Sequence, residues 1–175
     1  MKRKIDPFDY ANEILHAVKK GVLLTTKTDH QVNTMSISWG TMGIQWGLPI
    51  FTVFVRGCRH TGSMLDENPE FTVNIPLGAV DKEIIRYCGT KSGRDTDKFA
   101  ALGLTKDVPE TVSVPGIREL PLTLECKVIY KQQQYPDCMT DPEPHTHYPD
   151  NSQDIHADYH TAYYGQIVNA YIIED

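Results

Sequence analysis

The chain has 175 residues, of which 40% are hydrophobic and 23% are charged, and its formal net charge is -6. This composition is typical of a globular protein with one sizeable core, so we expect a single domain that covers residues 1–175. The mild acidity argues against a general attraction to nucleic acid or to anionic membranes, and any anion must be bound by a local group of cations.

The beginning of the chain and the cysteines predict the compartment. No apolar stretch typical of a secretory signal follows the basic residues 2–4, and no apolar run is long enough to cross a bilayer. The cysteines are widely spaced and form no C-x-x-C pair: Cys58, Cys88, Cys126 and Cys138. We therefore expect free thiols, neither disulfides nor a thiolate zinc site, in a cytoplasmic protein.

The first predicted element is a helix over residues 7–20. Asp6 is a suitable cap, Pro7 fits the first helical position, and Gly21 ends the segment. Apolar residues recur on one face of this helix: Phe8, Ala11, Leu15 and Val18.

Strands are predicted where Val, Thr, Ile and Leu cluster between turn signals. These segments are residues 22–28, 32–38, 48–55, 70–76, 122–134 and 162–173. Short helices are predicted from a cap at Thr61 or Ser63 to about Asn68, and over residues 81–89 and 95–103. Because strands predominate and do not alternate regularly with helices, we expect a mainly β fold, an antiparallel barrel or sandwich with peripheral helices.

A stretch rich in proline and histidine separates the last two predicted strands. Residues 135–157 show no repeat, so we expect a loop insertion there. Two histidine pairs have spacings that zinc sites use, His145 with His147 and His156 with His160. The composition favours the alternative, a solvated acidic segment with scattered histidines, and we expect no metal site.

Two glycine-containing segments concentrate basic residues. Three of the six arginines, Arg56, Arg59 and Arg94, lie in "VRGCRHT" and "CGTKSGRDTDKF", and the second segment adds Lys91 and Ser92. Guanidinium groups, an ammonium, hydroxyls and the backbone N–H groups of glycine turns are the groups that bind a phosphate. From either segment alone, ordinary surface ion pairs are the alternative. Neither G-x-G-x-x-G nor the P-loop spacing occurs, which argues against a Rossmann site or a P-loop kinase.

A third segment, "VNTMSISWGTMG", alternates small hydroxyl residues with Met35 and Ile37 ahead of Trp39 and Trp46. A flat ring could lie against such a strand, because hydroxyl and backbone groups can bond to its heteroatoms while a thioether or an indole packs on its face. A plain half-buried core strand shows the same alternation and is the alternative.

The order and spacing of "NTMSISWG", "VRGCRHT" followed by "LDENPEFTVNI", and "GTKSGRDTDKF" resemble the flavin reductase-like family. The resemblance covers residues 22–130 and resumes at "DYHTAYYGQIV". It implies an FMN-binding split β-barrel of the antiparallel Greek-key type, and a homodimer that binds FMN near the subunit interface. The insertion at 135–157 departs from the pattern, in which the last two strands follow closely.

The resemblance also implies a set of FMN-binding residues. Those along the isoalloxazine ring would be Asn33, Thr34, Met35, Ser36 and Ile37. Those at the phosphate and the ribityl chain would be Arg56, Cys58, Arg59 and Thr61. His60 would add a charge-assisted hydrogen bond if this loop holds a phosphate, and the alternative is an ordinary surface histidine. The second basic turn would add Lys91, Ser92 and Gly93, and it would be anchored by Asp97, Lys98 and Phe99.

The function implied is that of an NAD(P)H-dependent FMN reductase. Hydride transfer from a nicotinamide to a flavin requires two flat rings to stack and no acid–base side chain. This agrees with the lack of a Ser-His-Asp or paired-carboxylate pattern, and no catalytic side chain is named. The alternative is a non-enzymatic FMN carrier or electron-transfer protein, because the sequence contains no nicotinamide fingerprint.

Overall fold

The computed structural model describes residues 1–78, 80–148 and 158–174. Its main element is an antiparallel sheet with the strand order β3-β2-β6-β9-β10-β5-β4, and β1 pairs with β10 beside this path. The strands are β1 (Lys2–Lys4), β2 (Val22–Lys27), β3 (Val32–Ile37), β4 (Gly40–Gln45), β5 (Leu48–Arg56), β6 (Glu70–Ile75), β9 (Leu122–Gln133) and β10 (His160–Ile173). A smaller sheet pairs β7 (Lys106–Asp107) with β8 (Gly116–Ile117).

The order of the strands is of the Greek-key type. β2–β3 and β4–β5 are hairpins, whereas β6 returns to pair with β2, and β10 lies between β9 and β5. The predicted mainly β, antiparallel fold with peripheral helices is therefore confirmed.

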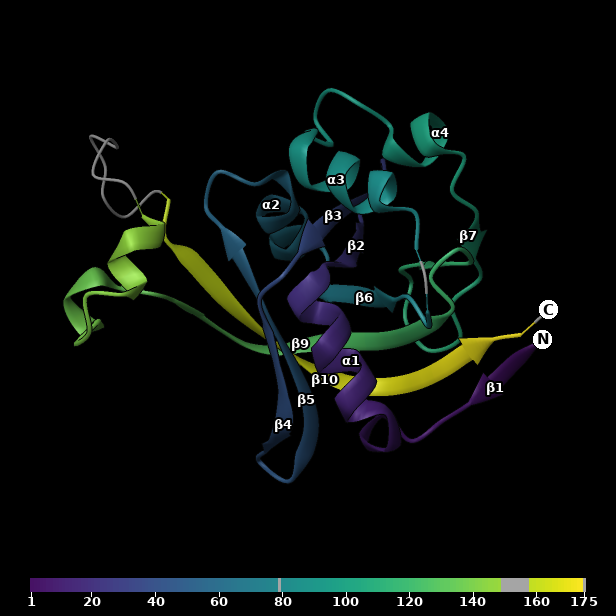
Figure 1. The fold of residues 1–175 in the computed structure, drawn as a ribbon, viewed down its shortest axis with the longest axis horizontal. Helices are drawn as coiled ribbons and strands as arrows, with labels where there is room; N and C mark the ends of the chain where they lie inside the picture. Colours follow the sequence, from purple (N-terminus) through teal and green to yellow (C-terminus); the bar gives the residue numbers. More distant parts are fainter. Residues whose placement is uncertain (79, 149–157, 175) are drawn as a thin grey trace.

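The helices lie at the periphery of the sheet. They are α1 (Ala11–Lys20), α2 (His60–Glu67), α3 (Lys82–Thr90) and α4 (Lys98–Leu102), with 3-10 turns at Pro7–Tyr10, Pro136–Cys138 and Pro144–His147. In Figure 1, α2, α3 and α4 gather beside β2 and β3, whereas α1 crosses the sheet nearer its middle. None of the helices in the described ranges is long and apolar enough to cross a membrane.

The first helix differs from its prediction. The Asp6 carboxylate does cap the segment by accepting from the Phe8 N–H at 2.9 Å, but residues 7–10 form a 3-10 turn and the α-helix begins at Ala11. The buried residues of α1 are Ile14 and Val18, whereas Phe8 and Leu15 remain 40% and 43% exposed. The predicted apolar face is therefore right at Val18 and wrong at Phe8 and Leu15.

The other helix boundaries show two further differences. α2 has Arg59 at its N-cap without a side-chain cap, so neither Thr61 nor Ser63 plays the predicted role. α3 continues through Gly89 and ends at Thr90, whereas α4 ends at Gly103 in the left-handed conformation, as expected for a C-terminal glycine.

Sequence reasoning missed β4, which contains two glycines and is half exposed. It pairs with β5 from Gly40 opposite Val53 to Gln45 opposite Leu48. The hairpin turn has positive φ at both Trp46 and Gly47, as two-residue hairpin turns require. Tertiary pairing with a strongly apolar neighbour therefore outweighs the low strand propensity of glycine.

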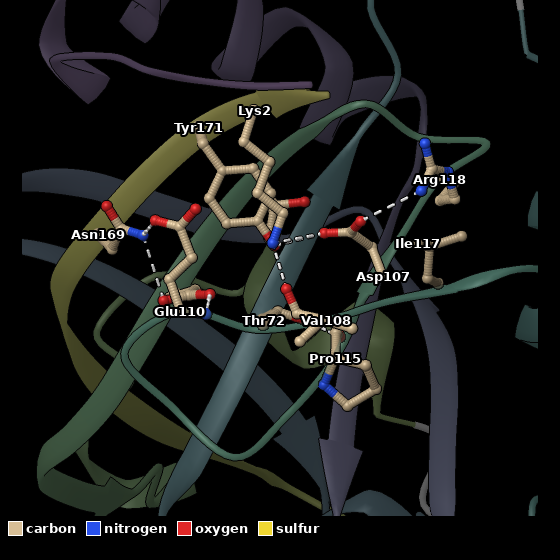
Figure 2. A network of polar contacts seen from close by, with 12 residues as sticks. Lys2, Thr72, Asp107, Val108, Glu110, Pro115, Ile117, Arg118, Asn169 and Tyr171 are labelled. Carbon is tan, nitrogen blue, oxygen red and sulfur yellow. Dashed lines mark hydrogen bonds and ion pairs between the residues drawn. The ribbon is translucent and has the colours of Figure 1, made fainter. Parts of the chain in front are cut away.

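A polar network fastens the segment around β7 and β8 to the sheet (Figure 2). The buried Asp107 carboxylate accepts from the Tyr171 hydroxyl at 3.2 Å and forms ion pairs with Lys2 at 2.8 Å and with Arg118 at 3.7 Å. Lys2 also donates to the Val108 carbonyl. These contacts tie β1, β10 and the loop together at the end of the sheet where the two termini meet.

Candidate functional site

Two neighbouring cavities meet at β3, beside the helices α2, α3 and α4. The first has a volume of about 320 Å³ and is lined by Asn33 and Met35, residues 58–61, residues 88–89 and 91–95, and Lys98. The second, of about 220 Å³, is lined by residues 35–39, Phe54, Arg56, Arg59 and His160. Met35 and Arg59 border both cavities, so the two spaces are adjacent.

The predicted site residues are largely brought together here. The first cavity is bordered by Asn33, Met35, Cys58, Arg59, His60, Thr61, Lys91, Ser92 and Gly93. Ser36, Ile37 and Arg56 border the second. Thr34 borders neither, because its hydroxyl lies in the core, where it donates to the Leu24 carbonyl and contacts the Thr25 hydroxyl.

The two basic turns converge on the first cavity. Arg94, in the second turn, donates from Nη1 to the Cys58 carbonyl of the first turn at 3.2 Å. The second turn also lies close to β3, because a Cβ at Gly93 would overlap the side-chain amide of Asn33. The same amide donates to the Thr61 hydroxyl at 3.3 Å. Asn33 therefore contacts both turns, and glycine at position 93 is required by this close approach.

The first cavity has an excess of positive charge. Four of the six arginines form ion pairs with carboxylates: Arg3, Arg56, Arg86 and Arg118. The other two, Arg59 and Arg94, have no carboxylate partner among the described residues, and both line this cavity. Lys91 and Lys98 add two more cations, against one lining carboxylate, that of Asp95.

Lys98 supplies a buried cation beneath the cavity. Only 3% of the residue is exposed, and its ammonium donates to the Thr34 carbonyl at 2.8 Å and to the Cys88 carbonyl at 3.0 Å. Burial lowers the pKa of this ammonium, and the nearby Arg59 guanidinium adds to that effect. These bonds join α4 to β3 and α3, and Asp97 caps α4 by accepting from the Phe99 N–H at 2.9 Å.

His60 is the first residue of α2 and borders the first cavity together with Arg59 and Arg94. Burial lowers its pKa, and Arg94 and Lys98 lower it further. Its ring contacts the side chains of Gln31 and Ser63. At neutral pH, His60 therefore provides a hydrogen bond rather than a fixed positive charge.

Arg56 faces the second cavity. Its guanidinium forms an ion pair with Asp158 at 2.6 Å and donates to the His147 carbonyl at 2.8 Å. The Cys58 thiol interacts with the same carboxylate, and its pKa is raised by burial and by this hydrogen bond. Although Arg56 and Arg59 are three residues apart, β5 ends between them, and Arg56 does not border the first cavity.

Aromatic side chains form one wall of the second cavity. The Trp39 indole lies 4.7 Å from the His160 ring and 5.0 Å from the His147 ring, measured between centroids. His160 is 8% exposed, and its Nδ1 lies 2.6 Å from the Tyr148 hydroxyl. The set of FMN-binding residues implied by the resemblance omits Trp39, His160 and Arg94, although all three lie in segments that sequence reasoning had singled out, and Arg94 had been named there as one of three arginines suited to a phosphate.

The histidine spacings considered for zinc lead to no metal site in the described ranges, where no group of three or more His, Cys, Asp or Glu residues could hold a metal ion. The rings of His147 and His160 both contact Trp39. His156 lies outside the described residues.

Comparison with known proteins identifies the family. Residues 15–175 match the family model of the flavin reductase like domain, and the chain therefore belongs to the flavin reductase-like family. A curated protein of Archaeoglobus fulgidus, described as uncharacterized, is 31% identical over 97 residues, which are 55% of this chain and 54% of that protein. The match thus spans about half the length of that relative.

Solved structures show the same fold. Flavoredoxin of Desulfovibrio vulgaris (Miyazaki F) is 26% identical, with a TM-score of 0.64 over 88% of this chain and 69% of that chain. An FMN-binding domain of a flavin reductases-like enzyme from Shewanella baltica OS155 is 14% identical, with a TM-score of 0.67 over 98% of this chain and 77% of that chain. Together with the open antiparallel sheet, these similarities confirm the predicted split β-barrel.

Proposed function

We propose that the protein is an FMN-binding oxidoreductase that transfers a hydride from NAD(P)H to the flavin. One observation carries this proposal: Arg59 and Arg94, which have no carboxylate partner among the described residues, line one cavity with Lys91 and Lys98. The adjacent second cavity is bordered by Trp39 and His160. A ligand that carries a phosphate on a flat ring system fits these two cavities, because the first is lined by cations and the second by a strand.

The phosphate would be bound in the first cavity. Arg59, Lys91 and Arg94 supply charge, Ser92 and Thr61 supply hydroxyls, and the start of α2 supplies backbone N–H groups. The ring would lie in the second cavity along residues 35–37, with Trp39 beyond them. When bound, FMN would supply the two-electron chemistry, and the protein would contribute placement and electrostatics.

The first experiment identifies the chromophore. The protein, purified without added flavin, is denatured and the released compound is separated by chromatography; we expect FMN rather than FAD or riboflavin. Reconstitution with each flavin measures the three dissociation constants. Equal affinity for riboflavin and FMN would contradict the assignment of the first cavity to phosphate.

The second experiment tests the reaction. Anaerobic stopped-flow mixing of the FMN-loaded protein with NADH or NADPH should bleach the visible absorbance of the flavin, since hydride transfer converts FMN to its reduced form. A second candidate function, a flavin-containing electron carrier, is favoured by the similarity to a flavoredoxin. Flavin that binds tightly but is bleached by neither nucleotide would support the carrier and contradict the reductase.

We also propose that the protein forms a homodimer. An exposed apolar surface on the β4–β5 hairpin and the neighbouring strands supports this: Ile44 is 73% exposed, Trp46 60% and Tyr130 42%. The rings of Trp46, Tyr130 and Tyr164 lie within 6.5 Å of one another, between centroids. Light scattering should give twice the chain mass, and Trp46→Glu should shift the mass toward the monomer if this surface is the interface.

A further inference from the structure

Tyr148, in the segment between β9 and β10, determines which hydrogen bonds His160 can form. The Tyr148 hydroxyl lies 3.0 Å from Gln134 Oε1 and 2.6 Å from His160 Nδ1. A hydroxyl has one proton, and an amide oxygen can only accept. The hydroxyl therefore donates to Gln134 and accepts from a proton on His160 Nδ1.

The other ring nitrogen of His160 is then an acceptor. A neutral imidazole carries one proton, so a proton on Nδ1 leaves the lone pair on Nε2. No hydrogen-bond partner of Nε2 occurs among the described residues. Every fully buried side-chain nitrogen atom of these residues has a partner, so Nε2 is not fully buried. Because His160 lines the second cavity, Nε2 is open to that space.

The charges around His160 keep the ring neutral. Burial lowers its pKa to about 4, and Arg56, Arg59 and His147 lower it as well, whereas Asp158 opposes them. Tyr148 packs against His160 edge-on and stacks on Tyr159 at 4.2 Å between centroids. The tyrosine that bonds Nδ1 is thus itself fixed by packing.

We propose that Tyr148 and Gln134 are positioning residues that hold His160 as the Nδ1–H tautomer, so that Nε2 accepts a hydrogen bond from a donor group of the molecule that exchanges electrons with the flavin. The ligand is a neutral N–H or O–H donor such as a carboxamide. A carboxylate has no proton to donate to Nε2, and the Arg56 guanidinium on this side of the cavity is already paired with Asp158. The tautomer follows from the hydrogen bonds alone, whereas the ligand class rests on the proposed function.

The tautomer is tested by nitrogen NMR of the protein labelled with ¹⁵N-histidine, without flavin. We expect the His160 signals of an Nδ1–H imidazole at neutral pH. Tyr148→Phe removes the acceptor, and Gln134→Leu leaves the hydroxyl free to donate to Nδ1; both should shift His160 toward the Nε2–H tautomer. Tyr10→Phe is the matched control, because its hydroxyl accepts from Arg3 at 3.4 Å and contacts neither Gln134 nor His160. Unchanged His160 signals in both variants would overturn the proposal.

The ligand class is tested by comparing reduced nicotinamide and reduced nicotinic acid dinucleotides as hydride donors. In the wild type, kcat/KM should favour the carboxamide, and in Tyr148→Phe and Gln134→Leu this ratio should fall about tenfold, the scale of one misplaced hydrogen bond. FMN affinity should stay the same. An unchanged ratio with altered tautomers would refute the ligand class. Failure of every form to bind FMN would refute the proposed function and leave the NMR result standing.

Discussion

Replacement of Arg94 by alanine provides a sharp test of the phosphate assignment. Arg94 borders the first cavity but not the second, so its guanidinium should affect the phosphate end of a flavin and not its ring. Among the described residues, the Arg94 guanidinium donates to the Cys58 carbonyl at 3.2 Å, and a hydrogen bond to such a neutral group contributes about 0.5–1.5 kcal/mol. The fold should therefore tolerate the substitution.

The expected loss in FMN affinity follows from the charges around the cavity. One charge-assisted hydrogen bond contributes about 1.5–3 kcal/mol, which corresponds to roughly 10- to 150-fold in the dissociation constant. Arg59, Lys91 and Lys98 remain after the substitution, so we expect the lower part of this range. The affinity of the variant for riboflavin, which lacks the phosphate, should fall by less than about threefold.

The assay is a titration of apoprotein with FMN and with riboflavin, followed by quenching of flavin fluorescence at fixed ionic strength. Arg86→Ala is the matched control, because Arg86 is an exposed arginine paired with Glu83 on α3. The difference between FMN and riboflavin should shrink as salt is added, since the cavity is open to solvent. Equal losses for the two flavins, or no loss for FMN, would refute the reasoning.

Three further predictions concern residues whose contacts or pKa values are set by their surroundings. Gly93→Ala should weaken FMN binding at least tenfold (on the order of one lost charge-assisted contact), because the added methyl overlaps Asn33 and displaces the basic turn. The wild-type protein should lose stability as the pH falls from 6.5 to about 4, because the His160 pKa is lower in the folded state and the unfolded chain therefore binds the proton more tightly. At ~1.36 kcal/mol per pKa unit this loss is at most about 3 kcal/mol. His160→Gln should abolish it, which urea unfolding at several pH values measures. Tyr171→Phe should lower the free energy of unfolding by about 1–2 kcal/mol, because the buried Asp107 carboxylate loses one of its donors.

Each of these predictions has a control within the chain. Gly43→Ala adds the same methyl where nothing lies within 4 Å, so it should bind FMN normally. His16→Gln replaces an exposed histidine and should keep the wild-type pH dependence. Tyr130→Phe removes an exposed hydroxyl and should cost less than about 0.5 kcal/mol. A variant that behaves like its control would contradict the corresponding argument.

Local sequence signals predicted much of the fold. The strands β2, β3, β5, β6, β9 and β10 follow runs of branched and aromatic residues. β4 could not be predicted in this way, because its strand conformation depends on pairing with β5, far more than on its own glycine-containing sequence. The short strands β7 and β8 likewise depend on contacts with distant residues such as Tyr171.

The candidate site was predictable as a set of segments but not as a geometry. The sequence shows two basic turns, and it does not show that Arg94 reaches the Cys58 carbonyl or that Arg59 borders both cavities whereas Arg56 borders only the second. These facts depend on where β5 ends and where α2 begins. The sequence singled out His160 only through its spacing from His156, whereas its place in the site depends on its position opposite Arg56 at the start of β10.

Charged side chains have different roles at the two ends of the molecule. At the end that holds β1, the buried Asp107 carboxylate is matched by Lys2, by Arg118 and by a tyrosine hydroxyl, so the charges there stabilise the fold. At the end that holds α2 and α4, Arg59 and Arg94 stand without carboxylate partners among the described residues. Both arginines are exposed, so water solvates them when no ligand is present, and an anion in the first cavity would add charge-assisted hydrogen bonds to them. The position of these two arginines beside one cavity therefore indicates a site for an anion more strongly than the number of basic residues does.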